Sequence, residues 1–279
     1  MSVNNDDLAS ELRGLASPAT ADCASGMKTI ILAGGRGTRL QPYTSVLPKP
    51  LMPVGDRAIL EVVIRQLARA GFTDVTLSVG HLAHLIEAVF GDGHKHDVKI
   101  RYVREDVPLG TAGSLRIVPD LSETFLMLNG DLVTTLDYRD LVRAHRASGN
   151  LLTIATTARQ VEIDYGVLGL ELGTGETSRI VHIDEKPRIV VTVSMGIYVI
   201  EPEVLDFIPQ GAYFDFPDLV GELLRAHQQV GAYDHDGLWL DIGRHDDYAQ
   251  AVKLFEQGTL AMLDNEFDAL EPPIVVTNA

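Results

Sequence analysis

Seven short apolar runs recur along the chain, and each is suited to a buried strand. They occupy residues 28–33, 75–80, 98–103, 125–131, 151–158, 193–200 and 230–235. Between several of them, apolar residues recur at helical spacing, in the segments 59–70, 82–90, 138–147 and 217–227. Gly71 directly follows the first helical segment, where a glycine in the left-handed conformation commonly ends a helix.

The order of these segments predicts the fold class. Strands and helices alternate from residue 28 to residue 131, which indicates βαβ units and a parallel sheet with helices on both faces. The stretch 151–200 is richer in strands, with a turn in LGTGETS at 172–178. We therefore expect one α/β domain with a Rossmann-like, mixed and mostly parallel sheet, whose later half adds β-structure over the carboxyl edge. Ligands of open α/β sheets bind at that edge.

The two ends of the chain differ in composition from the middle. Residues 1–26 are rich in Ser, Ala, Asp and Asn and lack the apolar region of a signal peptide, so we expect a disordered extension. Residues 27–257 form the predicted domain, and residues 258–279 form an acidic tail with four acids and no bases. Apolar runs of membrane-spanning length are absent from the sequence, so we expect no membrane partner.

Charge narrows the classes of partner. The 279 residues are 46% hydrophobic and 22% charged, enough for a sizeable core, and the net charge is −16. So acidic a protein is unsuited to general nucleic-acid binding, which requires a basic surface, but local cations can still hold a small polyanion. The single cysteine, Cys23, excludes an internal disulfide and fits a reduced cytoplasmic setting.

One segment runs against this acidity. Residues 32–55 read LAGGRGTRLQPYTSVLPKPLMPVG, and residues 27–57 hold five basic side chains against one acidic. Glycines that follow a strand let backbone N–H groups converge on an anion, and the spacing fits neither a Rossmann fingerprint nor a Walker A loop. Arg39 offers a bidentate fork to phosphate oxygens, and Lys49 is held on a stiff segment between two prolines.

This segment resembles the signature of the sugar-1-phosphate nucleotidylyltransferases, also called nucleotide-sugar pyrophosphorylases. It matches GGxGTRLxPxTxxxPKPLxPV at every defined position, and one departure follows it at Ala58, where proline is more usual. Further matches extend to residue 244: PLGTAGSL (108–115), LNGD (128–131), YGVL (165–168), DEKP (184–187), SMGIYV (194–199) and LWLDIGR (238–244). PLGTAG looks most like the mannose- or heptose-1-phosphate guanylyltransferase branch.

The resemblance implies a GT-A-like nucleotide-diphospho-sugar transferase fold and a Mg²⁺-dependent reaction. A sugar-1-phosphate oxygen would attack the α-phosphorus of a nucleoside triphosphate and release pyrophosphate, with positioning and charge neutralisation as the protein's main contributions. Arg39, Lys49 and Asp131 are the implied catalytic residues, and Asp131 and Asp241 the implied metal ligands. Members of this family usually self-associate, so a homo-oligomer is plausible.

The resemblance also assigns the substrate contacts. The residues implied to bind the nucleotide are Leu32, Ala33, Gly34, Gly35, Gly37, Thr38, Arg39, Glu105, Pro108, Gly110 and Thr111. Those implied to bind the sugar phosphate are Asn129, Gly166, Glu185, Lys186 and Gly196. Arg36 is a further candidate beside the triphosphate. The short motifs do not encode which sugar is used.

Glu105 is the residue that bears on the choice of base. In the resembling families, the residue five positions before the glycine of PLGTAG faces the base edge. A carboxylate only accepts hydrogen bonds, which suits the two adjacent donors of guanine better than the edges of uracil or thymine. We therefore favour GTP, with dTTP or UTP and glucose-1-phosphate as the alternative. Glu105 pointing to solvent or pairing with Arg104 is the other reading of this residue.

Two other classes of function stay open from the sequence. A non-catalytic nucleotide-sugar-binding regulatory subunit would keep the fold, but the intact Arg39, Lys49, Asp131, Lys186 and Asp241 argue against it. An NAD-type oxidoreductase is disfavoured because Asp56, near the required distance, lies in a proline-rich loop. His94 and His96 stand in a polar turn without further ligands and are expected to be solvated.

Overall fold

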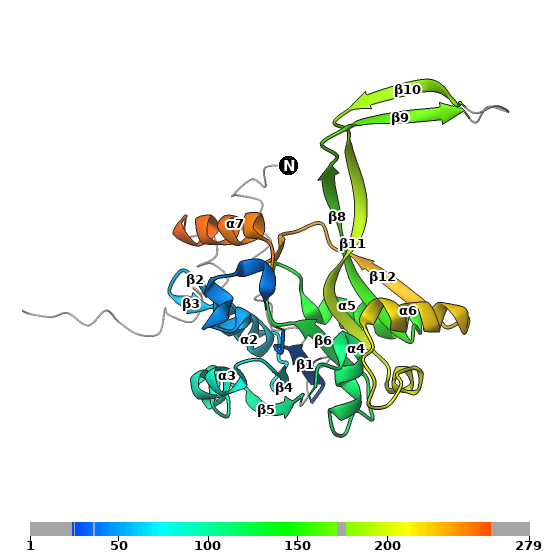
Figure 1. The fold of residues 1–279 in the computed structure, drawn as a ribbon. Helices are drawn as coiled ribbons and strands as arrows, with labels where there is room; N and C mark the ends of the chain where they lie inside the picture. The colour runs from blue at the N-terminus through cyan, green and yellow to red at the C-terminus, as the bar shows by residue number, and fades with distance from the viewer. Residues whose placement is uncertain (1–23, 25, 36, 106, 172–176, 258–279) are drawn as a thin grey trace, which may run out of the picture.

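A seven-stranded sheet forms the centre of the computed structural model (Figure 1), which describes residues 24, 26–35, 37–105, 107–171 and 177–257. Its strand order is β12-β8-β11-β6-β1-β4-β5. The strands are β1 (Lys28–Leu32), β4 (Asp74–Val79), β5 (Lys99–Arg104), β6 (Phe125–Asn129), β8 (Leu152–Glu162), β11 (Arg188–Ile200) and β12 (Val230–Asp234). Neighbouring strands are parallel except where β11 pairs with β6 and β8. The predicted mixed, mostly parallel sheet is thereby confirmed.

Helices connect these strands at the predicted places. They are α2 (Ile59–Arg69), α3 (Ala83–Phe90), α4 (Gly110–Gly113), α5 (Tyr138–Ser148), α6 (Phe216–Arg225) and α7 (His245–Glu256). The helical spacing predicted α2, α3, α5 and α6 to within one or two residues at each end, whereas α4 and α7 were not expected. Within the described ranges, every helix is too short or too polar to cross a bilayer.

The sheet separates two apolar clusters. Alternate residues of a strand point to opposite faces, so Ile31 of β1 packs in one cluster and Ile30 in the other. The first cluster lies under α2, α3 and α5, and the second lies under α4, α6 and the 3₁₀ turn Pro202–Phe207. Helices thus cover both faces, as the near-continuous apolar runs predict.

The end of α2 shows how local sequence fixes these elements. Gly71 has a φ of +88°, as expected of a left-handed cap. The N–H of Phe72 donates to the carbonyl of Leu67 at 2.9 Å, which satisfies a carbonyl that the helix leaves free. Ala24 is fully buried and packs in the first cluster beside this turn, so packed structure reaches into the predicted extension. Residues 1–23 and 25 and the whole tail 258–279 lie outside the described residues.

A smaller layer lies beside the main sheet. It contains the pairs β2 (Pro53–Val54) with β3 (Arg57–Ala58) and β7 (Leu132–Thr134) with β13 (Trp239–Asp241). A third apolar cluster joins these strands to α7. The hydroxyl of Tyr248 donates to the carbonyl of Pro53 at 2.8 Å, which holds α7 against the segment that follows the glycine-rich loop, residues 34–38.

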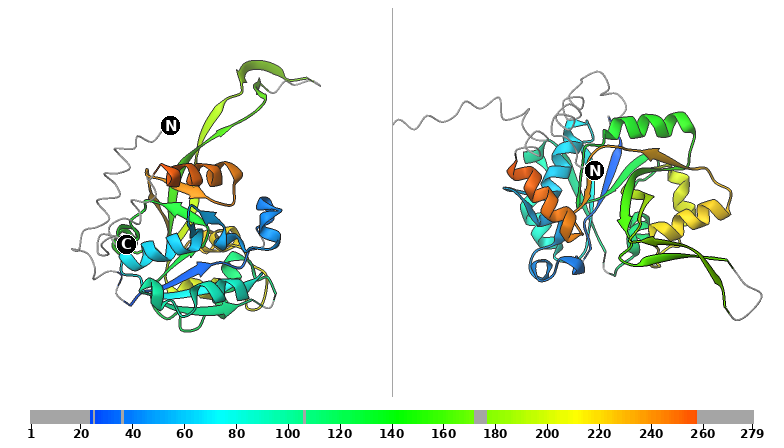
Figure 2. Two further views of the ribbon diagram at one scale, coloured as in Figure 1. Left: turned by 90° about the vertical axis from the view of Figure 1, so that its left-hand side faces the viewer. Right: turned by 90° about the horizontal axis from the view of Figure 1, so that it is seen from above.

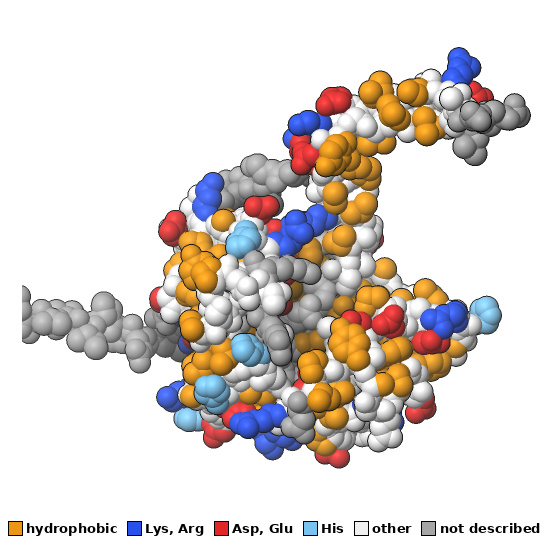
Figure 3. Space-filling view, viewed as in Figure 1, with side chains coloured by type: hydrophobic (Ala, Val, Ile, Leu, Met, Phe, Trp, Pro, Cys, Tyr) orange, Lys and Arg blue, Asp and Glu red, His pale blue; other side chains and the backbone are white. Residues whose placement is uncertain are grey.

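A β arm, which consists of the outer halves of β8 and β11 and the hairpin β9 (Gly166–Glu171) and β10 (Arg179–Glu185), rises from the sheet. Figures 1 and 2 show that it leaves the body of the molecule, so it does not cover the carboxyl edge as expected. Apolar side chains follow the arm (Figure 3) and are largely exposed: Val161, Val167, Leu168, Leu170, Ile180, Val181, Ile183, Ile189 and Val190. The predicted turn at 172–178 lies mostly outside the described residues.

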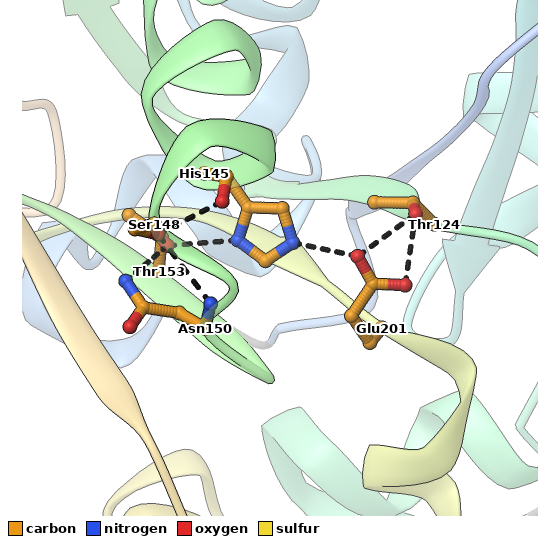
Figure 4. A network of polar contacts seen from close by, with 6 residues as sticks. All are labelled: Thr124, His145, Ser148, Asn150, Thr153 and Glu201. Atoms are coloured by element: carbon orange, nitrogen blue, oxygen red, sulfur yellow. Dashed lines mark hydrogen bonds and ion pairs between the residues drawn. The ribbon is translucent and has the colours of Figure 1, made fainter.

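A buried polar network ties α5 to the sheet (Figure 4). The ring of His145, which is 1% exposed, donates from Nε2 to Glu201 Oε1 at 2.9 Å. Its Nδ1 pairs with the Thr153 hydroxyl at 2.8 Å, and the Thr124 hydroxyl donates to the Glu201 carboxylate at 2.8 Å. Because every polar atom of the ring has a partner, this histidine is accommodated in the core.

We predict that Glu201→Ala lowers the free energy of unfolding by about 1–3 kcal/mol, because the buried Nε2–H of His145 loses its acceptor. Urea denaturation followed by circular dichroism measures the change. Glu203→Ala is the matched control, since Glu203 lies two residues away with an exposed side chain. Equal stabilities of the two variants would contradict a stabilising role for the network.

Candidate active site

A cavity of about 500 Å³ opens where β1 and β6 end. These two strands are neighbours at the centre of the sheet, and the order in which the chain adds strands reverses between them. From β1, the chain first adds β4 and β5 on one side, and then β6 and β11 on the other. Such a switch point leaves a crevice at the carboxyl ends of the strands. The lining residues are Leu32, Ala33, Gly34, Gly35, Gly37, Thr38, Leu40, Lys49, Pro50, Glu105, Pro108, Gly110, Thr111, Asn129, Asp131, Tyr213, Asp215 and Gly243.

Most of the predicted nucleotide-binding residues meet in this cavity. Ten of them line it, together with the predicted catalytic residues Lys49 and Asp131. Arg39 belongs to the 3₁₀ turn Thr38–Leu40 at the end of the loop, but its side chain is not described. Arg36 lies outside the described residues. The roles of both arginines therefore stay predictions.

The glycine-rich loop is packed too closely for larger residues at Gly37. This glycine has a φ of +61°, and a Cβ placed on it would lie 2.8 Å from Thr44 Cγ2 and 3.1 Å from Lys49 Cβ. The Thr44 hydroxyl donates to the carbonyl of Gly37 at 2.7 Å. The loop is therefore fixed against the turn that carries Lys49.

Lys49 joins the loop to the two predicted metal ligands. It begins the 3₁₀ turn Lys49–Leu51, and its side chain is mostly buried, with 16% exposed. The ammonium forms an ion pair with Asp131 and lies 3.6 Å from Asp241 Oδ1. Burial raises the pKa of Asp131, and the nearby Lys49 charge opposes that rise.

Asp241 reaches this point from the far end of the sequence. It ends β13, whose partner strand β7 follows Asp131 directly, and the N–H of Ile242 donates to the carbonyl of Asp131 at 3.0 Å. The N–H of Gly243 donates to Asp241 Oδ1 at 2.8 Å and orients the carboxylate. Two strands far apart in sequence thus place their carboxylates around one ammonium.

This set of donors fits a hard divalent cation. Mg²⁺ is commonly held by one or two carboxylates while water and phosphate oxygens complete its shell. The described part of the chain gathers no group of three or more His, Cys, Asp and Glu side chains suited to a metal, so a dedicated protein cage is not present there. His94 is exposed and pairs with Asp92 at 2.6 Å, as expected of a solvated turn. The same expectation is wrong for His96, whose ring packs 5.6 Å from that of Phe90 and whose partial burial lowers its pKa.

Glu105 faces the cavity. Its carboxylate accepts from the Ser78 hydroxyl and from the N–H of Leu109, each at 3.0 Å. Arg104 pairs with Glu87 at 2.8 and 2.5 Å, so the alternative in which Arg104 binds Glu105 is not observed. Each carboxylate oxygen retains a lone pair for a further donor.

Sequence reasoning missed two lining residues of the cavity. Tyr213 and Asp215 line the cavity, and the Tyr213 hydroxyl donates to Asp215 Oδ2 at 2.6 Å, which raises the pKa of Tyr213. The N–H of Thr111 donates to Asp215 Oδ1 at 3.0 Å. An Asp one residue before Phe216-Pro217 is a recognisable helix N-cap, but nothing in the sequence indicates that it meets Thr111.

The predicted sugar-phosphate residues do not form one group. Asn129 lines the cavity and contacts Gly196, on which a Cβ would lie 2.5 Å from Asn129 Nδ2. Gly166 pairs with Glu185 in the hairpin, and the N–H of Lys186 donates to the carbonyl of Tyr165 at 3.3 Å. Gly166, Glu185 and Lys186 lie where the β arm bends, and they do not line the cavity.

Comparison with known proteins agrees with this geometry. An α/β sheet with a glycine-rich loop, a lysine and two carboxylates at its switch point is suited to a phosphorylated ligand. The family model described as nucleotidyl transferase matches residues 28–258, and the chain belongs to this family.

Curated relatives and a solved structure extend the match. The UTP–glucose-1-phosphate uridylyltransferase of Synechocystis sp. is 35% identical over 247 residues, which cover 81% of this chain and 63% of that protein. Mannose-1-phosphate guanyltransferase beta-A of Xenopus laevis is 34% identical over 83% of this chain and 65% of that protein. The chain thus spans a little under two thirds of both relatives. The structure of HddC from Yersinia pseudotuberculosis shares the fold, with a TM-score of 0.64 and 22% identity. The match covers 82% of this chain and 99% of that one.

We predict that Gly37→Ala lowers the free energy of unfolding by about 1–2 kcal/mol, because the left-handed conformation is unfavourable for alanine. The added Cβ also crowds Thr44. Gly35→Ala is the matched control in the same loop, since a Cβ there meets nothing within 4 Å. Urea denaturation of both variants measures the difference, and indistinguishable midpoints would show that the loop relaxes without cost.

Proposed function

We propose that the protein is a Mg²⁺-dependent sugar-1-phosphate nucleotidylyltransferase that favours GTP. An oxygen of the sugar-1-phosphate attacks the α-phosphorus of the nucleoside triphosphate, the bond to the β-phosphate oxygen breaks, and pyrophosphate leaves. The observation that carries this proposal is the meeting of the glycine-rich loop, Lys49 and Asp131 at one cavity, with Asp241 Oδ1 3.6 Å from the Lys49 ammonium. The names of the two curated relatives support the same reaction class.

The phosphate end of the cavity supplies charge and orientation. Backbone N–H groups of residues 34–38 would bind phosphate oxygens, and Arg39 would add a bidentate contact. The Lys49 ammonium would neutralise the charge that develops as the bond to the leaving pyrophosphate breaks. Asp131 and Asp241 would hold Mg²⁺, which supplies positive charge at the phosphate oxygens when bound.

The sugar side involves two parts of the structure. Asn129 and Gly196 lie at the cavity, whereas Gly166, Glu185 and Lys186 lie at the bend of the β arm. We assign Glu185 to sugar hydroxyls and Lys186 to the sugar phosphate. In this structure both lie outside the cavity lining, so these contacts require the bend of the arm to approach the cavity.

Glu105 supports guanine as the base. Its carboxylate is fixed at the cavity by Ser78 and Leu109, and it can accept from the adjacent N1–H and N2–H₂ donors of guanine. One relative is named a guanyltransferase and another a uridylyltransferase, so the same reaction with UTP or dTTP and glucose-1-phosphate is the alternative. A cytoplasmic setting and a homo-oligomer belong to the same proposal.

The substrate panel tests the proposal directly. Pyrophosphate release is measured with Mg²⁺ for GTP, UTP, dTTP, CTP and ATP, each with mannose-, glucose- and heptose-1-phosphate. We expect turnover with GTP and its loss on addition of excess EDTA. Glu105→Gln should lower kcat/KM for GTP by about 10–100-fold, since a hydrogen-bonded polar partner contributes 1–3 kcal/mol.

Other results of the panel separate the alternatives. Turnover only with UTP or dTTP would retain the reaction class and overturn the role of Glu105. Binding of nucleotide without turnover for any pair would favour the non-catalytic regulatory subunit. Turnover that survives EDTA would remove Mg²⁺ from the proposal.

Lys49→Ala tests the centre of the mechanism. We expect kcat to fall by about 10²–10³-fold, comparable to the loss of one preorganised charge-stabilising group, while the protein still folds. Lys99→Ala is the control, because Lys99 is an exposed lysine at the start of β5. A Lys49→Ala variant that melts normally and retains full activity would exclude Lys49 from the mechanism.

A further inference from the structure

A buried carboxylate that the proposed reaction does not use lies directly behind Asp241. Asp247, in the first turn of α7, is 3% exposed. Its Oδ2 accepts the backbone N–H of Asp241 at 3.1 Å, and its Oδ1 accepts from Arg159 Nη2 at 2.5 Å. Neither Asp247 nor Arg159 lines the cavity.

Arg159 and Trp239 continue this contact into the main sheet. The Arg159 guanidinium stacks over the Trp239 ring at 5.3 Å from its centroid. The Trp239 indole N–H donates to the carbonyl of Met195 at 3.0 Å, next to Gly196. Arg159 is on β8 where this strand enters the β arm, so the contacts join α7 and β13 to the base of the arm.

The contacts of the Asp247–Arg159 ion pair indicate that it positions Asp241. A buried ion pair seldom stabilises a fold more than apolar residues of equal size, because both charges lose their hydration. Here, one oxygen of the pair holds the main chain of Asp241, while the Gly243 N–H holds its carboxylate. The main chain and the carboxylate of Asp241 are therefore each held by a hydrogen bond, and Asp247 links the Asp241 N–H to β8 through Arg159.

We propose that Asp247 and Arg159 are positioning residues that fix Asp241 for binding of the divalent cation. The role of Asp241 as a metal ligand rests on the proposed function. Outer partners of metal ligands commonly contribute 10–100-fold to metal affinity. Loss of the pair therefore weakens the cation site without removing any of its ligands.

Mn²⁺ alone is the probe, added to the full chain and followed by the electron paramagnetic resonance of free Mn²⁺. The Asp241→Ala variant defines the part of the binding that belongs to this site. Asp247→Asn and Arg159→Gln should each raise the Mn²⁺ dissociation constant about 10-fold or more. Arg159→Lys, which keeps the charge, should recover part of the affinity. Asp74→Asn is the matched control, because Asp74 forms a similar ion pair with Arg101 at 2.6 Å.

Trp239 supplies a second readout. It is the only tryptophan of the chain, so its fluorescence reports this cluster without a label. Arg159→Gln should change the emission of the free protein, whereas Asp74→Asn should leave it unchanged. In the pyrophosphate assay, the Mg²⁺ concentration for half-maximal rate should rise by the same factor as the Mn²⁺ dissociation constant, while kcat at saturating Mg²⁺ changes less.

The possible results of these measurements lead to different conclusions. Unchanged Mn²⁺ affinity in Asp247→Asn and Arg159→Gln, with lower melting temperatures, would show a purely structural pair. Equal Mn²⁺ binding by the wild-type chain and Asp241→Ala would remove the cation site itself. If Asp247→Asn does not fold, the comparison of Arg159→Gln with Arg159→Lys decides. Weakened Mn²⁺ binding in a chain without pyrophosphate release would support positioning and reject the reaction.

Discussion

The Lys49 ammonium lies between Asp131 and Asp241, and the rest of the site is arranged around this contact. It joins three parts of the chain: the turn after the glycine-rich loop, the end of β6 and the end of β13. Two carboxylates this close would repel each other without a cation, and burial makes that repulsion stronger. The lysine thus keeps the site compact, while the carboxylates retain acceptor capacity.

The same contact explains how an acidic protein can hold a phosphorylated ligand. The net charge of −16 gives an average field that repels anions, so attraction must be local. Gly34, Gly35 and Gly37 place backbone without side chains at the cavity, and Lys49 adds one fixed cation beside them. Two acidic side chains of the lining, Glu105 and Asp215, each accept hydrogen bonds from neighbouring donors.

The sequence alone could predict those parts of the fold and the site that are formed by contiguous residues. Strands such as β1 and β6 could be predicted because they are buried on both faces and read as unbroken apolar runs. The loop 34–38 could be assigned to the cavity because its residues follow one another directly after β1. Asp131 could be placed at the sheet's edge because it comes just after a buried strand.

Features that depend on contacts between distant segments could not be predicted from the sequence. The strand β13 has three residues, too few for a periodic pattern, and it pairs with an equally short β7. Tyr213 reaches the cavity because the N–H of Gly113 donates to the carbonyl of Phe214 at 2.9 Å, a contact between distant segments. The β arm was predicted to cover the carboxyl edge, and it leaves the body instead, because alternation within a strand does not show in which direction the strand leaves the sheet.

The distance in sequence between the halves of the site affects how the site is formed during synthesis. The glycine-rich loop lies near the start of the domain, but the strand that carries Asp241 and the helix that supports it come last among the described elements. Tyr248 and Pro53, which hold these parts together, are 195 residues apart. A ribosome-bound chain that has made the whole sheet therefore still lacks the second carboxylate. The two carboxylates can meet only after β13 has emerged and paired with β7.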